Sequence, residues 1–153
     1  MHKLGLRNTR IKMTVNRKEL AERFLRGVYG GDPTVVDDLA SEDIVSSYPI
    51  FERLFNAPAI RGKESVKAFA VGFSKRWIDP QIVVHEAIAE GDRVVLLWSF
   101  QARNASTGQD GDPPTDQLHN WGGLTLFRFN KAGQIVAEIG EESSPGPFER
   151  LAY

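Results

Sequence analysis

The sequence contains no cysteine, which excludes disulfide bonds, thiolate metal sites and a cysteine nucleophile. The absence of cysteine suits a reducing compartment, so we expect a cytoplasmic protein. No apolar run approaches the ~20 residues that a membrane-spanning helix requires, and we therefore expect no membrane partner. A strong excess of one charge is also missing, because 19 basic and 20 acidic residues nearly cancel. This balance does not favour a nucleic acid as partner.

The chain has the length of one ordinary domain, with 153 residues of which 41% are hydrophobic and 25% are charged. Residues 1–15 contain several basic residues and no acid. We expect a flexible basic tail there, and a targeting or anion-binding arm is the alternative. Neither a repeat nor a linker interrupts residues 16–153, which predicts a single domain.

Two helices are predicted near the beginning of that domain. Asn16, with Glu19 three residues later, has the pattern of a capping box, and apolar residues at four-residue spacing follow as far as Gly30. Asp32-Pro33 then starts a second, short helix that ends near residue 40, because Asp caps a helix and Pro is tolerated in its first turn.

A third helix is predicted after Gly62, and Asp79-Pro80 ends it. Its apolar residues recur at helical spacing and share one face. They are Val66, Phe69, Ala70, Phe73 and Trp77. Between the second and third helices, Pro49 and Pro58 predict that residues 44–61 form no regular helix, although residues 44–48 suit a brief strand.

From Gln81 onward the hydrophobic period becomes that of strands. Residues 81–89 and 93–103 predict one hairpin, and residues 117–130 and 134–142 predict another, with a polar loop over residues 104–116 between them. Helices followed by strands favour an α+β fold. We therefore predict a cone-shaped roll in which three N-terminal helices pack on a curved antiparallel sheet of four long strands and a short one.

Three segments of this pattern resemble the nuclear-transport-factor-2-like (NTF2-like) superfamily, in its SnoaL-like branch, which includes polyketide cyclases. The segments are residues 60–69 (IRGKESVKAF), 89–100 (AEGDRVVLLWSF) and 122–138 (GGLTLFRFNKAGQIVAE). The resemblance implies a cavity between the helices and the concave face of the sheet, and a homodimer through the other face. The cavity would bind a small hydrophobic molecule.

Aromatic side chains would supply most of the apolar surface of such a cavity. The alternative for each of them is that it packs in the hydrophobic core. The candidate substrate-binding residues are Phe69, Phe73, Trp77, Trp98, Phe100 and Trp121.

In the cyclase branch, a histidine and an acid on the last two strands move protons next to a carbonyl group. The candidates here are His119 and either Glu141 or Glu142. Strict alternation turns His119 and Glu141 toward the cavity, and a β-bulge would reverse either assignment. Tyr48 is a third catalytic candidate, because a phenol can donate a hydrogen bond to an enolate oxygen. This chemistry needs no cofactor.

Two other branches of the superfamily fit less well. Epoxide hydrolases would need an Arg and an Asp at about the positions of Trp98 and Phe100, and the isomerases would need a carboxylate close to Tyr48. Three scattered histidines also predict no metal site.

The sequence leaves three functions open. The first is an enzyme for aldol cyclisation, isomerisation or dehydration of a hydrophobic carbonyl compound. The second is a non-catalytic module that binds a hydrophobic ligand. An interaction protein that works through its exposed sheet face is the third. Polar groups that converge inside an apolar cavity would favour the first.

Overall fold

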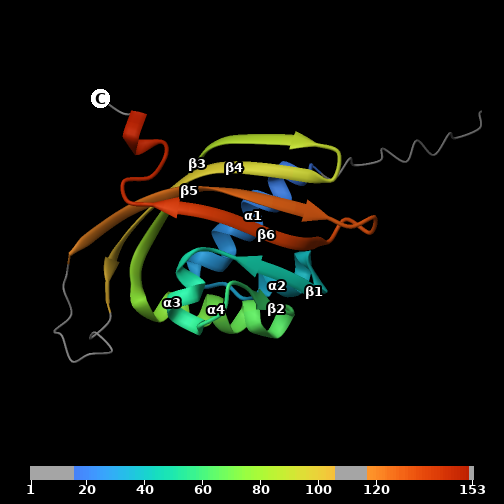
Figure 1. The fold of residues 1–153 in the computed structure, drawn as a ribbon, viewed down its shortest axis with the longest axis horizontal. Helices are drawn as coiled ribbons and strands as arrows, with labels where there is room; N and C mark the ends of the chain where they lie inside the picture. The colour runs from blue at the N-terminus through green and yellow to red at the C-terminus, as the bar shows by residue number, and fades with distance from the viewer. Residues whose placement is uncertain (1–15, 106–116, 152–153) are drawn as a thin grey trace, which may run out of the picture.

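The computed structural model describes residues 16–105 and 117–151. The predicted basic tail and most of the predicted loop over residues 104–116 lie outside these ranges. In the described part, helices and strands alternate before a run of long strands completes the sheet (Figure 1). The elements are α1 (Arg17–Gly30), α2 (Thr34–Leu39), β1 (Ala40–Ser47), α3 (Ile50–Phe55), β2 (Ile60–Arg61), α4 (Lys63–Arg76), β3 (Trp77–Glu90), β4 (Arg93–Asn104), β5 (Leu118–Phe129), β6 (Ile135–Ser143) and the 3₁₀-helix η1 (Glu149–Leu151).

The start of α1 confirms the capping prediction. The Asn16 side chain accepts a hydrogen bond from the Lys18 backbone N–H at 3.1 Å and donates one to Glu19 at 3.3 Å. Gly31 ends the helix with φ of 80°, a left-handed conformation that glycine adopts without strain. None of the described helices is long and apolar enough to cross a membrane.

Two helix predictions were wrong in detail. Residues 44–61 do contain a helix, α3, because Pro49 has helical angles (φ −55°, ψ −32°) and stands where a first turn begins. The α4 helix ends at Arg76, so Trp77 is the first residue of β3 rather than part of the helix. The described chain therefore has four helices where the sequence predicted three.

The six strands form one curved sheet with the order β2-β1-β6-β5-β4-β3. The four long strands pair antiparallel, as predicted. Strand β1, which lies between β2 and β6, instead runs parallel to β6, a pairing that the sequence did not predict. In Figure 1, α1 lies behind the sheet, and α3 and α4 lie beside its β1–β2 edge. The α+β architecture is thus confirmed, with one parallel pair in the sheet.

The inner face of the sheet carries the core. Four alternate residues of β4 are all at most 1% exposed. They are Val94, Leu96, Trp98 and Phe100. Phe127 of β5 packs edge-on against Phe24 of α1, with ring centroids 6.1 Å apart. Helix α1 therefore closes the concave side of the sheet at one end and leaves the other end to the pocket.

Candidate functional site

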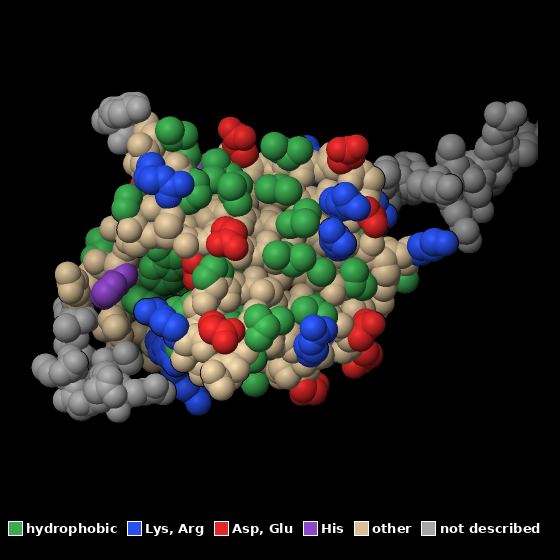
Figure 2. All heavy atoms as spheres, in the orientation of Figure 1, with side chains coloured by type: hydrophobic (Ala, Val, Ile, Leu, Met, Phe, Trp, Pro, Cys, Tyr) green, Lys and Arg blue, Asp and Glu red, His purple; other side chains and the backbone are tan. Residues whose placement is uncertain are grey.

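One pocket opens beside α3, where the last residues of α4 meet the start of β5 and the end of β6. Its volume is about 550 Å³, within the range of sites for small organic ligands. Figure 2 shows a hollow with an apolar floor, rimmed by a histidine and by Lys or Arg side chains.

Aromatic rings form most of the pocket wall. Trp77 and Trp121 lie 4.9 Å apart between ring centroids, and Phe73 contacts both of them. Deeper in, Tyr29 of α1 packs edge-on against Phe73 at 5.0 Å. Phe69 completes the wall from α4. A flat apolar ligand could therefore stack on these rings.

The described pocket wall contains a single acid, Glu142 of β6. Burial raises the pKa of this carboxyl to about 7. The neighbouring Glu141 raises it further, and the positive charge of Arg53 opposes the rise. Glu142 can therefore gain or lose a proton near neutral pH, which is the property that general acid–base catalysis requires.

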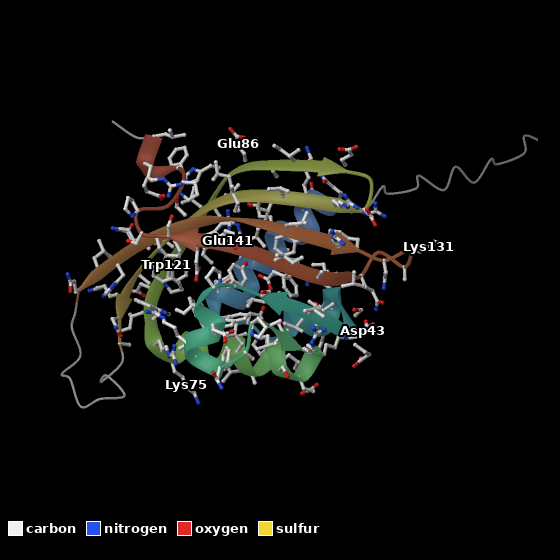
Figure 3. The ribbon with its side chains drawn as sticks, in the orientation of Figure 1. Asp43, Lys75, Glu86, Trp121, Lys131 and Glu141 are labelled. Atoms are coloured by element: carbon white, nitrogen blue, oxygen red, sulfur yellow. The ribbon has the colours of Figure 1, made fainter. Side chains whose placement is uncertain are left out.

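The predicted inward orientation of Glu141 is wrong. Glu141 pairs with the exposed Leu124 and is itself exposed, on the outer face of the sheet (Figure 3). The cause is a register shift between β5 and β6: Phe129 pairs with Ile135, whereas Arg128 pairs with Ala137. This extra residue is a β-bulge, and it reverses the alternation that follows it.

His119 lines the pocket, as predicted, at the start of β5. Its ring packs against Trp77 with centroids 5.3 Å apart. The His119 Nε2 atom is buried and has no hydrogen-bond partner among the described residues. Because a buried polar atom without a partner costs free energy, a ligand atom that bonds to Nε2 would be favoured.

His119 and Glu142 do not form a directly paired dyad along the sheet. Glu142 pairs with Gly123, which is four residues from His119 on β5. At ~3.4 Å per residue and ~4.8 Å between strands, their Cα atoms lie at most about 14 Å apart. Both side chains extend toward one pocket, so a small ligand can lie between them.

A second acid, Glu138, lies beneath the pocket and is only 1% exposed. Its carboxyl accepts hydrogen bonds from Tyr48 at 2.8 Å and from Ser46 at 2.9 Å. Trp98 donates to Thr125 at 2.8 Å, and the Thr125 and Tyr48 hydroxyls are 2.9 Å apart. Since an indole N–H can only donate, the hydrogen bonds run from Trp98 through Thr125 and Tyr48 to Glu138.

The pKa values of this network reflect its burial. Burial raises the pKa of Glu138 to about 7, and its two hydrogen bonds limit the rise. Burial also raises the pKa of Tyr29 well above its usual range, and the Glu138 and Glu142 carboxylates add to the effect. A hydrogen bond with Tyr48 opposes the rise. Tyr29 therefore stays neutral near neutral pH, and it lines the pocket as a phenol, a group that can donate a hydrogen bond.

The structure brings five of the nine predicted site residues to the pocket and leaves four outside it. Those that line it are Phe69, Phe73, Trp77, His119 and Trp121. Those that do not are Tyr48, Trp98, Phe100 and Glu141. Tyr48 is buried and its hydroxyl is engaged with Glu138 and Thr125, while Trp98 and Phe100 are core residues behind the pocket wall.

Four pocket residues with ionisable side chains were not predicted from the sequence or were only weighed as an alternative. Tyr29, Arg53 and Arg76 were not considered, and Glu142 was the second choice after Glu141. Tyr29 belongs to the apolar face of α1, and its position in the sequence therefore indicates a core residue rather than a pocket residue. Arg76 lies within the predicted third helix, off its apolar face, and Arg53 lies in a segment that was not expected to be helical.

The described residues offer no ready metal site, since no three His, Asp or Glu side chains come together in residues 16–105 and 117–151. The pocket itself supplies an imidazole, a carboxyl with a near-neutral pKa and a phenol. These groups can take up and deliver protons on a bound molecule.

Several proteins of known structure share this fold. One of them, from Jannaschia sp. CCS1, is designated a SnoaL-like polyketide cyclase. It has a TM-score of 0.69 and 20% sequence identity, and the alignment covers 84% of this chain and 85% of that one. AclR from Streptomyces galilaeus, described as a hydroxylase, has a TM-score of 0.67 and 22% identity, with coverages of 90% and 85%. An epoxide hydrolase of the LEH-like type from M. tuberculosis has a TM-score of 0.62 and 16% identity, with coverages of 89% and 89%.

At these identities the similarity concerns the fold, because one fold hosts many chemistries. A search of curated protein sequences found no significant match. The sequence profile of the SnoaL-like domain, in contrast, matches residues 21–138, which is most of the chain and extends from within α1 to the buried Glu138. The protein therefore belongs to the SnoaL-like domain family.

Proposed function

We propose that the protein is a cofactor-free enzyme that transfers protons on a hydrophobic carbonyl compound, in an aldol cyclisation, an isomerisation or a dehydration. The observation that carries the proposal is the presence of His119 and the near-neutral carboxyl of Glu142 in one aromatic pocket. Membership of the SnoaL-like family and the fold shared with a designated polyketide cyclase support it.

In the proposed mechanism the ligand carbonyl lies between the two groups. One of them, as a base, removes a proton from the carbon next to the carbonyl. The other, as an acid, protonates the carbonyl oxygen, so that an enol forms without a free enolate. Tyr29 donates a hydrogen bond to the same oxygen and stabilises the charge that develops on it. The α-carbon of the enol then attacks a second carbonyl. In an isomerisation, a different carbon of the conjugated enol takes up the proton instead.

The enolisation step can be measured without the natural substrate. We expect the protein to accelerate deuterium exchange at the α-carbon of a bicyclic aromatic ketone such as 2-tetralone, followed by NMR in heavy water. His119→Ala should lower the exchange rate by about a hundredfold, in line with the usual contribution of a general acid or base.

The second histidine of the described chain provides the matched control. His85 lies outside the pocket, where its ring is 2.6 Å from the Ser99 hydroxyl and stacks on Phe148. His85→Ala should therefore leave the exchange rate unchanged. Equal rates for the wild type and His119→Ala would rule out the proposed role of His119. Binding of the ketone without any accelerated exchange would instead favour a non-catalytic ligand-binding module.

We also propose a homodimer through the outer face of the sheet. Four apolar residues face one another in a row across β3, β4, β5 and β6. They are Ile88, Val95, Leu126 and Ile139, and Ile88 and Ile139 are 62% and 44% exposed. Figure 2 shows apolar side chains gathered over the sheet on this face. An apolar patch of this kind is typical of an interface.

The dimer predicts a specific effect of a buried charge. Leu126→Lys should convert a species with the mass of two chains into one with the mass of a single chain, because an unpaired lysine is costly at an apolar interface. Light scattering after size-exclusion chromatography measures the mass. Val71→Lys is the control, since Val71 is an exposed apolar residue of α4, away from the sheet. A wild type that elutes as a single chain would contradict the dimer.

A further inference from the structure

Two arginines line the pocket beside its aromatic wall. Arg53 comes from α3 and is exposed, and Arg76 is the last residue of α4 and is partly buried. They enter from two different helices that the fold brings to the same opening. Figure 2 shows Lys or Arg side chains along the lower edge of the hollow.

Neither guanidinium lies within ion-pair distance of a carboxylate among the described residues, although the charge of Arg53 acts on Glu142 from farther away. In residues 16–105 and 117–151, Arg53 and Arg76 form no ion pair and no side-chain hydrogen bond. Two arginines of α1, in contrast, form ion pairs: Arg23 contacts Asp38 at 2.7 Å, and Arg26 contacts Glu22 at 2.9 Å. The two pocket arginines thus keep their hydrogen-bond donors available.

The charge of the described pocket wall is positive. Arg53 and Arg76 each carry a full positive charge, because a guanidinium stays protonated throughout the physiological range. The acid of the described wall is Glu142, and its carboxyl is partly protonated near neutral pH, so it offsets less than one of these two positive charges. A neutral or cationic ligand would leave this excess charge beside an apolar wall, whereas an anion would offset it.

We propose that the ligand of this pocket is an aromatic organic acid, whose ring system lies against Trp77 and Trp121 and whose carboxylate binds Arg53 and Arg76. A guanidinium presents parallel N–H groups that match the two oxygens of a carboxylate. The half-buried position of Arg76 limits the screening of this contact by solvent. This inference rests on the proposed function, in which the pocket binds a small molecule, and it specifies in addition that this molecule is negatively charged.

A pair of probes that differ only in charge tests it. 2-Naphthoic acid and 2-naphthamide have the same ring system, and only the acid is ionised at neutral pH. By isothermal titration calorimetry, we expect the acid to bind the wild type at least about tenfold more tightly than the amide, because charge-assisted hydrogen bonds are stronger than neutral ones. Raising the salt concentration should weaken binding of the acid and leave binding of the amide unchanged.

Variants assign the preference to the two arginines. Arg53→Gln with Arg76→Gln should abolish the preference for the acid while leaving the affinity for the amide within about twofold of the wild type. Glu142→Gln should tighten binding of the acid, because it removes a negative charge from the pocket. Lys75→Gln is the control: Lys75 is the neighbour of Arg76, is exposed and does not line the pocket (Figure 3).

The outcomes separate this inference from the proposed function. Equal affinities of the wild type for the acid and the amide, or a preference that survives in the double variant, would overturn the anionic ligand and leave the apolar pocket in place. Binding of neither probe would overturn both. A melting temperature of the double variant equal to that of the wild type would establish that lost binding is not lost folding.

Discussion

Replacing Gly140 with alanine is expected to destabilise the protein by about 3 kcal/mol or more, which is the upper range for overpacking a core. A Cβ atom at this position of β6 would lie closer than 3.0 Å to three ring atoms of Tyr48. Tyr48 cannot move aside at low cost. Its ring packs edge-on against Tyr29 and Phe51, and its hydroxyl is bonded to Glu138.

Urea denaturation of Gly140→Ala measures this loss, with the thermal midpoint as a second readout. For a chain of this size, about 3 kcal/mol corresponds to a fall of roughly 10 °C. Gly72→Ala is the matched control, because Gly72 lies in α4 with no atom within 4 Å of an added Cβ. Alanine there should stabilise the helix by up to about 1 kcal/mol. Equal stability of the two variants would contradict the packing of Tyr48 against β6.

The parts of the fold that the sequence predicted are those with strong local periodicity. The capped start of α1 and the alternation in β4 depend on residues close in sequence, and both match the structure. Helix α3 and the parallel pairing of β1 with β6 depend on contacts distant in sequence. Six residues of α3 are too few to form a stable helix alone, so packing of Phe51 into the core decides its structure.

One extra residue in β6 accounts for the choice of the wrong acid at the candidate site. Strict alternation along β6 predicted that Glu141 turns inward, which would turn Glu138 and Glu142 outward. The bulge after Ile135 exchanges the faces, so that Ile139 is 44% exposed and Glu138 is buried. Hydrophobic periodicity cannot reveal a bulge. The extra residue is extra only relative to the partner strand, and the sequence of one strand does not show how its residues pair with the other. The aromatic wall lies on α1, α4, β3 and β5, outside the shifted strand, and was unaffected.

The stability of the folded protein should fall as the pH rises from about 5 to about 8, because of Glu138. Its pKa is about 7 in the folded protein and near the ordinary 4.5 in the unfolded chain. A carboxyl with a raised folded pKa stabilises the fold fully below its unfolded pKa, and this contribution is lost as the pH rises through the folded pKa. The shift corresponds to a loss of about 2.5 kcal/mol in the free energy of unfolding over this range.

Glu138→Gln should remove that part of the pH dependence. Gln is neutral at every pH, its carbonyl oxygen can accept from Tyr48, and its amide can donate to the Ser46 hydroxyl. Urea denaturation at several pH values should therefore give a flatter profile for the variant. Glu142 contributes a loss of the same sign, since its pKa is also raised to about 7, and Glu142→Gln isolates its share. If the wild type and Glu138→Gln lost stability equally between these pH values, Glu138 would have to be ionised in the fold at pH 5. Its hydrogen bonds from Tyr48 and Ser46 would then outweigh its burial, and the hydrogen-bonded chain beneath the pocket would end in a permanent negative charge.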